Sequence, residues 1–408
     1  MKEDWIECTL GEVCFTTSGG TPSRQNKDFY NGNIPWVKSG ELDKGIIYDS
    51  EEHISEEAIK KSSAKIFPKG TLLFALYGAT IGKMATLGVD AATNQAICGI
   101  YKSDAFNSEY LYHNLFFQKN FLIQQGIGGA QPNISQTILK KLDIPIPPLV
   151  EQTAIIKKIE ELFSSLDSGI ADLKKAQDQL VIYRQAVLKK AFDLNLKDHK
   201  IQEICKEIFA GGDKPKDFFS KSKTKECSVP ILANAVANNG LYGYTKTARV
   251  NELAITIAGR GSGTGHVELR DEPFVPIVRL ITLIPDLEKV VPKYLMYFLK
   301  NLNIKGTGSA IPQLTIPTVK SYVINLPSLE RQHQIVQEIE SRLSVCDKVE
   351  KDISDSLEKA QALRQSILKK AFEGKLLSEV EIAKCKADKD YEPASVLLER
   401  IKKEKVKK

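Results

Sequence analysis

The sequence predicts an α+β fold, with two mixed α/β domains separated by two long helices that pack as an antiparallel coiled coil. The first observation is a repeat: residues 147–196 (PPLVEQTAIIKK…AVLKKAFDLNL) match residues 327–376 (PSLERQHQIVQE…SILKKAFEGKL) without a gap, so that Gln152 lies over Gln332. The second is that each copy follows a segment of short β-branched and aromatic runs broken by Gly, Pro and Asn. A repeat of this length makes the chain a tandem of two similar halves.

Length and composition agree with a globular protein of two or three domains. The 408 residues are 42% hydrophobic and 26% charged, which is typical of packed domains. The N-terminal residues are polar and acidic, and no run approaches the roughly 18 apolar residues that cross a bilayer. We therefore expect a cytoplasmic protein without a membrane contact. The seven cysteines never form C-x-x-C, which favours free thiols over a zinc site or disulfides.

Residues 1–146 form the first mixed domain, and residues 147–196 form the first long helix. In the domain, strands are expected in IPWVKSG, TLLFALYG and AICGIY, and helices from Ser55 to Ser63 and from Ser108 to Gln124. In the helix, apolar residues recur every seven positions, which is a heptad stripe. One line runs through Ile159, Leu166, Leu173, Leu180 and Val187, and the other through Ile155, Leu162, Gly169, Ala176 and Tyr183.

Residues 197–326 form the second mixed domain, residues 327–376 the second long helix, and residues 377–408 a Lys-rich C-terminal tail. The domain has strand-like runs (SVPILANAV, ELAITIAG, FVPIVRLITLI) and one helical stretch near Pro292 to Leu302. The helix repeats the heptad in the same phase but more weakly. Its lines are Ile339, Cys346, Ile353, Ala360, Ile367 and Ile335, Arg342, Val349, Ser356, Leu363.

The two long helices are predicted to act as a spacer. A helix of about 40 residues is roughly 60 Å long, too long to be buried inside either mixed domain. The two helices can bury their stripes against each other, which would place one mixed domain at each end of an antiparallel pair. A coiled coil that only dimerises the chain is the simpler alternative.

The two mixed domains differ in charge. Residues 1–150 contain 14 Lys and Arg against 16 Asp and Glu, whereas residues 193–326 contain 18 against 13, within a chain of net charge +6. A nucleic-acid binder usually has a basic face, and only the second block hints at one. Charge alone does not predict DNA binding.

The mixed domains nevertheless echo each other in sequence. GGAQPNIS before the first helix matches GSAIPQLT before the second, with Ala130 and Pro132 over Ala310 and Pro312. EYLYHNLF resembles KYLMYFLK, and LLFALYGATIGK resembles LAITIAGRGSGTG. In the last pair a strand runs into a loop with glycines four positions apart, which we align as Gly78 and Gly82 with Gly259 and Gly263.

Enzymatic interpretations of these loops are weak. GATIGKM has one residue too few between its glycines for a nucleotide P-loop, and a Met where that motif has Ser or Thr. GRGSGTG follows a strand, as a dinucleotide or S-adenosylmethionine loop would, but another strand is expected after it instead of a helix N-terminus. The chain has no D/N-P-P-F/Y/W, no G-x-S-x-G and no histidine pair at metal-ligand spacing. We therefore predict no catalytic residues, no metal and no cofactor.

The order of these features resembles the specificity subunit of a type I restriction-modification enzyme. Each mixed domain opens with a similar motif (WIECTLGEVCFTTSGGTPS, KIQEICKEIFAGGDKP), and each closes with P-x-L-x-x-Q and a helix ending L-K-K-A-F. The tail YEPASVLLERIKKEK is also similar to the ending of that family. The resemblance covers essentially the whole chain, and the order, duplication and spacing of the motifs are more specific than any one motif.

The resemblance implies a function in DNA recognition. In that family each mixed domain is a target recognition domain that reads half of a bipartite, asymmetric sequence in double-stranded DNA. The paired helices set the distance between the half-sites and dock two methyltransferase (modification) subunits, and restriction subunits complete the complex. The specificity subunit is not itself an enzyme: S-adenosylmethionine and ATP belong to its partners.

DNA contacts are expected from polar and basic residues in the loops that the two domains share, because polar side chains read base edges and Lys and Arg hold phosphates. In the first domain these are Thr21, Ser23, Arg24, Lys38, Lys83, Asn94, Gln95 and Gln131. In the second they are Lys214, Lys216, Asn234, Lys246, Arg260, Ser262, Thr264 and Gln313. The glycines of these loops are expected to serve backbone geometry instead.

Two alternatives remain open at this stage. A coiled-coil scaffold with two ligand-binding domains and no DNA role would show no salt-dependent binding to nucleic acid. A methyltransferase that uses the Gly259 loop would bind S-adenosylmethionine by itself.

Overall fold

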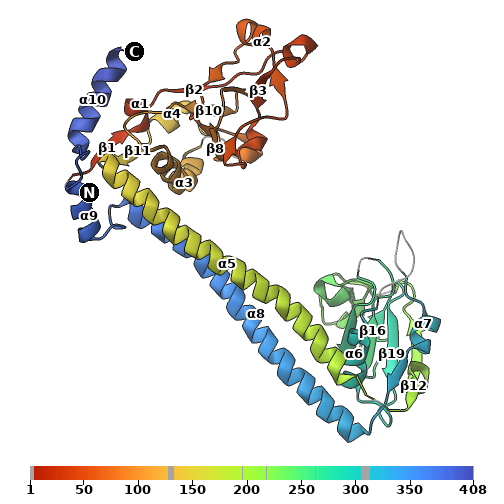
Figure 1. The fold of residues 1–408 in the computed structure, drawn as a ribbon. Coiled ribbons are helices and arrows are strands. Elements are labelled where there is room, and N and C mark those ends of the chain that lie inside the picture. Colours follow the sequence, from red (N-terminus) through yellow and green to blue (C-terminus); the bar gives the residue numbers. More distant parts are fainter. Residues whose placement is uncertain are drawn as a thin grey trace. The chain divides into compact units, whose positions relative to one another are not determined.

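The structure is a computed structural model that describes residues 4–126, 133–194, 196–216, 218–261, 263–304 and 313–407. It divides into two compact units (Figure 1). Unit 1 consists of Met1–Ala171 and Leu357–Lys408, and unit 2 of Asp172–Ser356. The long helices α5 (Leu149–Ala191) and α8 (Leu329–Phe372) each contribute one half to each unit.

Unit 1 contains two small sheets and a two-stranded ladder. The ladder pairs β1 (Ile6–Thr9) with β11 (Asp143–Ile146), the strand that leads into α5. One sheet has the order β2 (Thr16–Ser18), β10 (Ile97–Ile100), β7 (Leu72–Ala75), β8 (Met84–Leu87), β4 (Ile46–Ile47). The other has the order β5 (His53–Ile54), β3 (Ile34–Val37), β9 (Ala91–Thr93), β6 (Ile66–Phe67). Every residue of β7 and β10 is buried, which explains their continuous apolar runs.

The helices of unit 1 confirm the two predicted in the first domain. The predicted stretches correspond to α2 (Glu56–Lys61) and α3 (Ser108–Gln125). Each begins at a residue whose side chain accepts a backbone N–H, Ser55 for α2 and Asn107 for α3. The remaining helices are α1 (Leu10–Val13), α4 (Gln136–Lys140), α9 (Glu379–Lys386) and α10 (Ala394–Lys407), with short 3-10 turns η1 (Lys27–Tyr30), η2 (Ser39–Glu41) and η3 (Gly78–Thr80).

Unit 2 repeats this plan with fewer strands. A ladder pairs β12 (Asp198–Lys200) with β20 (Val323–Asn325). One sheet has the order β13 (Cys205–Ala210), β19 (Ile281–Pro285), β16 (Ala254–Ile257), β17 (Val267–Arg270). The other has the order β15 (Leu241–Thr245), β14 (Val229–Leu232), β18 (Val275–Pro276). The helices are α6 (Pro292–Asn301) and α7 (Ile316–Ser321), with 3-10 turns η4 (Ile201–Glu203) and η5 (Ala237–Gly240).

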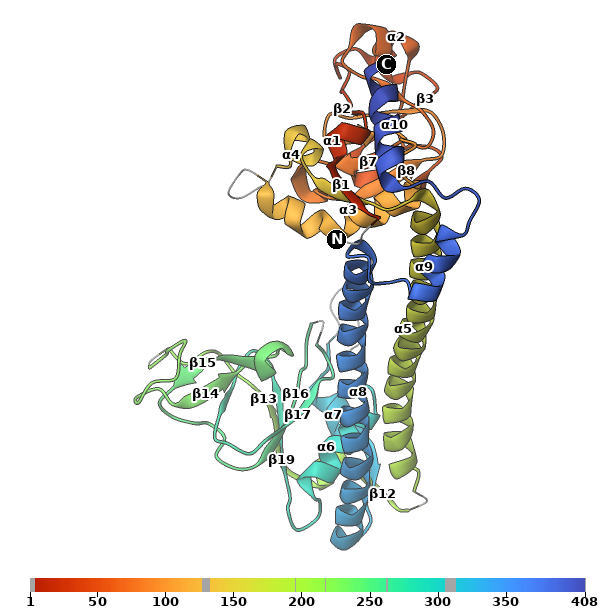
Figure 2. The ribbon, with the colours of Figure 1, turned by 90° about the vertical axis from the view of Figure 1, so that its left-hand side faces the viewer.

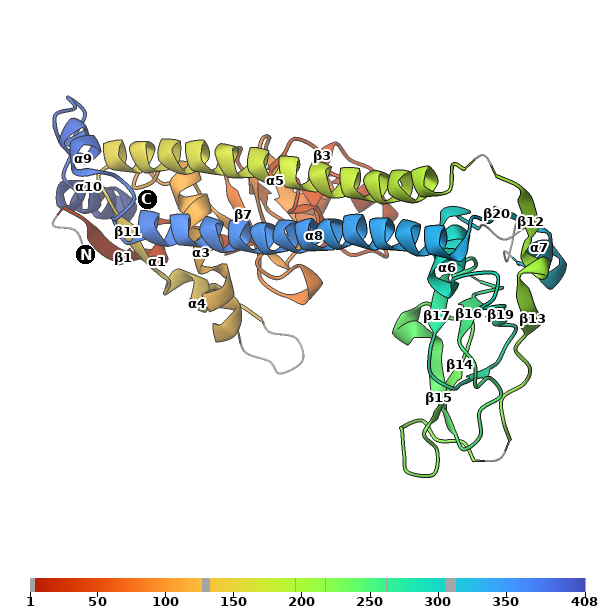
Figure 3. The same ribbon diagram turned by 90° about the horizontal axis from the view of Figure 1, so that it is seen from below.

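Helix α6 connects the sheet of unit 2 to the long helices. Its buried residues Tyr294, Leu295 and Leu299 belong to one apolar cluster with strand residues of β16 and β19 and with Ile335 and Ile339 of α8. Figure 3 shows α6 between the start of α8 and these strands. The core of unit 2 therefore includes the start of α8.

The two long helices run antiparallel, as predicted. In unit 1 the start of α5 pairs with the end of α8, where Arg364 forms an ion pair with Asp167. In unit 2 the end of α5 pairs with the start of α8, where Arg184 lies 2.6 Å from a carboxylate oxygen of Asp347. The first heptad line of α8 is buried throughout, which confirms it as the seam: Ile339, Cys346, Ile353, Ala360 and Ile367.

The second predicted heptad line is not a seam along its whole length. Ile155 and Ile335 are buried at the helix starts, where each mixed domain covers them. Tyr183, Val349 and Leu363 are between 38% and 51% exposed. A pair of helices buries only a narrow stripe on each, so the second line is covered only where another element supplies a surface.

The P-x-L-x-x-Q motif anchors each long helix to its mixed domain. Gln152 and Gln332 are fully buried. The amide of Gln152 donates to the carbonyls of Ala105 and Pro147 and accepts from the N–H of Asn107. Gln332 makes the same three bonds at positions 289, 327 and 291. A buried glutamine with all these bonds fixes the angle at which the helix leaves its domain.

Each long helix begins in one unit and ends in the other, and the Ala-Phe pair at its end packs into the core of the unit in which the helix ends. Phe372 ends α8, and its ring packs 5.4 Å from that of Tyr110 in unit 1. Phe192 follows α5 and packs 5.0 Å from Tyr294 in unit 2. Both tyrosines are fully buried, and each hydroxyl donates to a carbonyl of the strand before a long helix, at Pro145 or Asn325. This explains the sequence echo between EYLYHNLF and KYLMYFLK.

The C-terminal tail folds onto unit 1. The helix α10 lies beside α1 (Figure 1), and α9 lies along the start of α5 (Figure 2). Leu397, Leu398 and Ile401 of α10 are buried in the apolar cluster that contains Trp5 and Leu10. Lys402 donates to the carboxylate of Glu12 at 2.8 Å. Among the described residues, no helix is both long and apolar enough to cross a membrane.

Candidate nucleic-acid interface

The structure brings most of the predicted DNA-contact residues that it describes to one edge of the main sheet of each unit. Lys246 is an exception, because it follows β15 and lies by the start of β14. In unit 1 this edge is formed by three loops: the one after β2, the turn before β10 and the one after β7. These strands are antiparallel neighbours, so the end of β2, the start of β10 and the end of β7 must meet. In unit 2 the equivalent edge is formed where the end of β13, the start of β19 and the end of β16 meet, because these strands are also antiparallel neighbours. We call this edge the loop end of each unit.

The glycine loops of the two loop ends have the same backbone hydrogen bonds, displaced by 183 residues. In unit 1 the N–H of Gly82 donates to the carbonyl of Ala75, and that of Lys83 to the carbonyl of Thr80. In unit 2 Gly265 donates to Ala258, and His266 to Gly263. The counterparts of Gly78 and Gly82 are therefore Gly261 and Gly265.

The alignment made from sequence alone, with Gly259 and Gly263, is wrong by two positions. Gly78, Gly82, Gly261 and Gly265 all have positive φ, between 74° and 91°. This conformation favours glycine, which is why the spacing of four is retained. Gly259 is needed for another reason, because a Cβ there would lie 2.9 Å from the carbonyl oxygen of Arg279.

The turn before the central strand is also shared, and it identifies two residues that the sequence did not. In unit 1 the N–H of Ile97 donates to the carbonyl of Asn94, and in unit 2 that of Leu280 donates to Ile277. The central residues of these turns are Gln95 and Ala96 in unit 1 and Val278 and Arg279 in unit 2. Gln95 was predicted, but Val278 and Arg279 lie inside an apolar run that reads as one strand.

Val278 and Arg279 hold an unfavourable backbone conformation. Their φ angles are +51° and +60°, and Val278 is 58% exposed. A β-branched residue with positive φ is strained, and such strain occurs at functional sites. The conformation is held by N–H groups of both residues, which donate to the carbonyls of Gly212 and Gly211. The turn therefore presents a valine and an arginine to solvent from a fixed backbone.

The basic residues of the unit 1 loop end are paired with carboxylates. Arg24 lies 2.6 Å from Glu52, and Lys38 lies 3.0 Å from the same carboxylate. The hydrogen bond from Arg24 lowers the pKa of Glu52, so the carboxylate stays charged. Lys83 lies 2.9 Å from Asp43 and lowers the pKa of Asp43 in the same way. This edge is close to electrically neutral although it contains three cations.

The remaining predicted residues of unit 1 join the same edge. The hydroxyl of Thr21 is hydrogen-bonded to the side chain of Gln95, which links the loop after β2 to the turn before β10. The N–H of Asn94 donates to the carbonyl of Val37, next to Lys38. Ser23 is exposed in the same loop as Arg24. Gln131, like the predicted match of Ala130 and Pro132 with Ala310 and Pro312, lies outside the described residues.

In unit 2 two of the predicted basic residues lie against aromatic rings, as Arg24 of unit 1 also does over Tyr30. The Lys214 ammonium is 4.2 Å from the ring centre of Phe219, and that of Lys246 is 5.0 Å from Phe218, whose side chain is 57% exposed. Within the described ranges, no carboxylate forms an ion pair with Lys214, Lys216, Lys246 or Arg260. The exposed positive charge of unit 2 is therefore available to a phosphate backbone.

Asn234, Arg260, Thr264 and Gln313 shape this second loop end. The amide of Asn234 donates to the carbonyl of Arg260 and accepts from the N–H of Gly259 at 2.5 Å. Arg260 pairs with Gln313 in an antiparallel bridge, and the hydroxyl of Thr264 donates to Gly261. These bonds hold the loop, so Asn234 and Thr264 have structural roles besides any contact with DNA. Ser262 lies outside the described residues.

The glycine loop of unit 2 is a connection between antiparallel strands. It joins β16 to β17, and a Cβ on Gly265 would lie 1.9 Å from the carbonyl oxygen of Ile304. No helix N-terminus follows the loop to hold a phosphate or carboxylate. The seven cysteines are free, and burial raises the pKa of Cys8, Cys98 and Cys205 to about 12. Across the described ranges, no group of three or more His, Cys, Asp and Glu could hold a metal.

Comparisons with known proteins agree with this duplicated architecture. The family model described as "Type I restriction modification DNA specificity domain" matches residues 2–176 and again residues 195–359. The chain is 26% identical to the type I restriction enzyme EcoBI specificity subunit of Escherichia coli, over 99% of this chain and 93% of that one. It is 32% identical to a putative type I specificity subunit of Mycoplasma pneumoniae, over 58% of this chain and 65% of that one.

Solved structures show the same fold. A chain from a structure described as the structural basis of complex assembly and conformational transition of the type I R-M system matches with a TM-score of 0.76 and 19% identity, covering 92% of this chain and 99% of that one. The crystal structure of an HsdS subunit from Thermoanaerobacter tengcongensis matches with a TM-score of 0.62 and 20% identity, covering 92% and 98%. The predicted α+β fold with two mixed domains and two long helices is confirmed.

Proposed function

The chain belongs to the family of type I restriction-modification DNA specificity subunits, and we propose that it reads a bipartite, asymmetric sequence in double-stranded DNA with its two loop ends. The observation that carries this proposal is that both loop ends have one backbone framework and different side chains. A shared framework presents side chains in equivalent positions, and different side chains there recognise different bases. Each unit would read one half of the sequence.

The exposed polar residues of the two equivalent turns are proposed to determine the bases. In unit 1 this is Gln95, whose amide can pair with two atoms of an adenine edge. In unit 2 it is Arg279, whose guanidinium can do the same with a guanine. Lys214 and Lys246 would hold phosphates, because they are exposed and form no ion pair with a described carboxylate.

The other parts of the complex are proposed from the family. The long helices would dock two methyltransferase (modification) subunits, with restriction subunits added to them, and would fix the half-sites about one helical turn, roughly 34 Å, apart. Methyl transfer and ATP-driven cleavage would belong to these partners, so the chain itself is a non-catalytic subunit acting on cytoplasmic DNA. The hairpin geometry of the Gly261 loop supports this, because it lacks the helix that a cofactor loop would open.

The test is to co-express the chain with its genomic-neighbour modification subunit and to map methylated adenines in the host DNA by single-molecule sequencing. A bipartite motif with a fixed gap is expected. Exchange of residues 1–146 for those of a relative should change one half of the motif only. Unmodified DNA in the presence of a stable complex that binds S-adenosylmethionine would contradict the sequence-reading role and favour a scaffold.

Two single substitutions then assign the half-sites. Gln95→Ala should relax the motif in one half and Arg279→Ala in the other, each at one base, with a cost of about 1–3 kcal/mol for that base. Glu109→Ala, at an exposed position of α3 that is not among the predicted contacts, is the control for unit 1. Relaxation of the same half by both substitutions would contradict the assignment of one half to each unit.

A further inference from the structure

The two units share a short motif in the loop that follows the first strand of the main sheet. Residues 27–30 (KDFY) match residues 216–219 (KDFF). Each loop begins with a glycine, Gly19 or Gly211, whose N–H donates to the carbonyl of the residue that ends the shared turn. The loops therefore start at equivalent points of the framework. The motif comes eight residues after Gly19 but only five after Gly211.

The last ring of the motif has the same role in both units. The Arg24 guanidinium lies 4.3 Å from the ring centre of Tyr30, and the Lys214 ammonium lies 4.2 Å from that of Phe219. Each unit thus covers this ring with a cation from the same loop. The two motifs therefore match in structure as well as in sequence.

The ring before it is placed in opposite ways in the two units. Phe29 is 7% exposed and belongs to an apolar cluster with Trp36 and Ile54. Phe218, its counterpart, is 57% exposed. The φ angle of Phe218 is +55°, whereas Phe29 has no positive φ. A bulky residue with positive φ is strained, so unit 2 accepts an unfavourable backbone conformation at a ring that gains little burial in return.

Neighbouring contacts hold the backbone of Phe218 in place. Ser220 and Tyr244 of β15 exchange two backbone hydrogen bonds, at 3.0 Å and 2.8 Å. The thiol of Cys227 donates to the carbonyl of Phe218 at 3.3 Å. A ring that a fixed backbone holds in solvent loses little conformational freedom on binding. Strain of this kind occurs at functional sites, where it keeps a side chain ready for a ligand.

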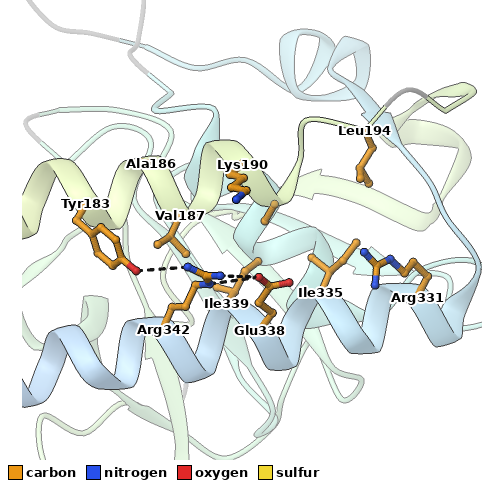
Figure 4. Close-up of a pocket in the computed structure, with 11 residues that line it drawn as sticks. Tyr183, Ala186, Val187, Lys190, Leu194, Arg331, Ile335, Glu338, Ile339 and Arg342 are labelled. Atoms are coloured by element: carbon orange, nitrogen blue, oxygen red, sulfur yellow. Dashed lines mark hydrogen bonds and ion pairs between the residues drawn. The ribbon is translucent and has the colours of Figure 1, made fainter.

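The surroundings of Phe218 are basic. The ammonium of Lys246 lies 5.0 Å from its ring centre. Residues 213–226 contain five lysines against three acidic residues, and all five lysines are exposed: Lys214, Lys216, Lys221, Lys223 and Lys225. Within the described ranges, none of these six lysines forms an ion pair with a carboxylate. On α8 of the same unit, by contrast, Arg342 donates to the carboxylate of Glu338, a dashed line in Figure 4.

This basic surface lies on the outer side of unit 2. Ser220 pairs with Tyr244 of β15, and Figures 2 and 3 both show β14 and β15 on the side of unit 2 away from α6 and the long helices. The surface is therefore separate from that of the long helices. Exposed lysines attract a phosphate backbone, and DNA also offers the flat apolar faces of stacked bases. Double-stranded DNA thus matches both the charge and the ring.

We propose that Phe218 inserts between two neighbouring base pairs of the DNA half that unit 2 reads, while the surrounding lysines hold the flanking phosphates. This inference rests on the proposed function, because it takes DNA as the partner. A ring that enters the stack partly separates two base pairs and bends the duplex, which costs least at flexible pyrimidine–purine steps. Unit 2 therefore selects a deformable step in addition to base edges. Unit 1 does not, because Phe29 is buried.

Fluorescence of 2-aminopurine tests the insertion. The base analogue is placed at one position at a time in a duplex with the mapped motif, across the half read by unit 2 and its flanks, and its emission rises where the stack opens. In the complex with the modification subunit, the target adenine should respond, because methyltransferases extrude their target base. A second responding position is expected beside the step that Phe218 enters. Its absence, while the target adenine responds, would overturn the insertion and leave the proposed function intact.

Two substitutions identify the ring as the cause. Phe218→Gly removes the ring and the strain together, so unit 2 should stay folded while the second signal disappears. Phe218→Trp keeps a flat ring and should retain the signal. Tyr48→Ala, which removes a 66% exposed ring from unit 1, is the control and should leave both signals unchanged. A second signal that persisted in Phe218→Gly would overturn the role of Phe218.

The methylated motif gives an independent measurement. With the unaltered chain, one step of the half read by unit 2 should be mainly pyrimidine–purine. In Phe218→Gly this preference should be lost, while the base assigned to Arg279 should stay the same. A step preference that remained in Phe218→Gly would overturn the inference. If the unaltered chain gave no bipartite motif, the proposed function would be contradicted, and the inference with it.

Discussion

Unit 1 and unit 2 build their loop ends from the same backbone hydrogen bonds, yet they differ in whether their predicted DNA-contact cations are paired with carboxylates. In unit 1, Arg24, Lys38 and Lys83 are each held by a carboxylate. In unit 2, Lys214 and Lys246 lie over aromatic rings. The comparison shows that two loop ends can share one backbone framework and still carry side chains of different charge and pairing.

This difference assigns separate contributions to the two units. Unit 2 can offer Lys214 and Lys246 to phosphates directly, because among the described residues neither forms an ion pair with a carboxylate. Unit 1 must exchange internal ion pairs for contacts with DNA, so its net gain from charge is smaller. We expect unit 2 to dominate salt-dependent affinity and unit 1 to contribute mainly through base contacts.

The largest effect is expected from Phe372 and Phe192, the aromatic residues at the ends of the two long helices. Phe372→Ala should destabilise unit 1 by about 3–4 kcal/mol, because it removes a buried ring packed on Tyr110 and Phe117. Phe192→Ala should destabilise unit 2 less, because Phe192 is only half-buried. Both tryptophans, Trp5 and Trp36, lie in unit 1, so tryptophan fluorescence in a denaturant titration reports on unit 1 alone. If Phe372→Ala left the tryptophan transition unchanged, the claim that the end of α8 completes the core of unit 1 would be wrong.

The buried glutamines give the next effect. Gln332→Ala should cost about 2–3 kcal/mol in unit 2, because it leaves the N–H of Val291 and two carbonyls without their partner. Gln152→Ala should do the same in unit 1. Hydrogen exchange of α6 should rise in the first variant only, and the exposed Gln177→Ala should change neither unit. If either glutamine substitution raised hydrogen exchange equally in both units, the prediction that each glutamine stabilises only its own unit would be wrong.

Binding to DNA should separate the units by charge. Lys214→Gln with Lys246→Gln should reduce the slope of log affinity against log salt by about 2, since each lost phosphate contact contributes about 0.9. Arg24→Gln with Lys38→Gln should reduce it by less, because these cations already have carboxylate partners. Fluorescence anisotropy of the assembled complex over a range of salt concentrations measures both slopes. Equal slopes for the two variants would remove the electrostatic distinction between the units.

The strained turn should respond to glycine in unit 2 only. Val278→Gly is expected to stabilise unit 2 by about 1 kcal/mol, because glycine adopts a positive φ without strain and this gain exceeds its extra entropy in the unfolded chain. Gln95→Gly in unit 1 lacks this gain, since Gln95 has no positive φ. Hydrogen exchange of β19 and β10 compares the two. Destabilisation by Val278→Gly would mean that the valine side chain contributes packing that outweighs the strain.

The smallest effect concerns pH and the tail of unit 1. The hydrogen bond from Lys402, with those from Thr9, lowers the pKa of Glu12 from 4.5 to about 2. A carboxylate with a depressed pKa stabilises the folded state above its ordinary value and loses this contribution as the pH falls towards 2. Between pH 5 and pH 2 the tryptophan transition of the unaltered chain should therefore approach that of Glu12→Gln. A constant difference between them over this range would contradict the ion pair.

Much of the fold could be predicted from the sequence because its signals are periodic and repeated. The long helices follow from heptads and from a gapless repeat, and the strands β7, β10 and β16 from short apolar runs. Most of the predicted contact residues that the structure describes also converge on one edge in each unit, because they follow or precede neighbouring antiparallel strands; Lys246 does not. Local pattern and chain order are enough for these features.

The remaining features depend on contacts that sequence patterns do not record. The glycine alignment failed because spacing alone cannot distinguish a glycine with positive φ, such as Gly261, from one that avoids a clash, such as Gly259. Val278 and Arg279 were missed because the four residues of their turn include no glycine or proline, although Pro276 stands directly before the turn. The second heptad line looks like a seam in sequence, but residues such as Ile155 and Ile335 are buried in the structure because a mixed domain covers the start of each helix.

The path of the chain through its cores sets an order for synthesis on the ribosome. Unit 2 is a single continuous segment, Asp172–Ser356, so all of its core residues are available before the last fifty residues of the chain, roughly, are made. Unit 1 has its first strands at the N-terminus but needs Leu368, Phe372 and Leu397 to fill the same apolar cluster. During synthesis unit 2 can therefore fold first, while the core of unit 1 stays incomplete until the end of α8 and the tail have been made. A stop codon before Phe372 would leave unit 2 able to fold and unit 1 open to proteases.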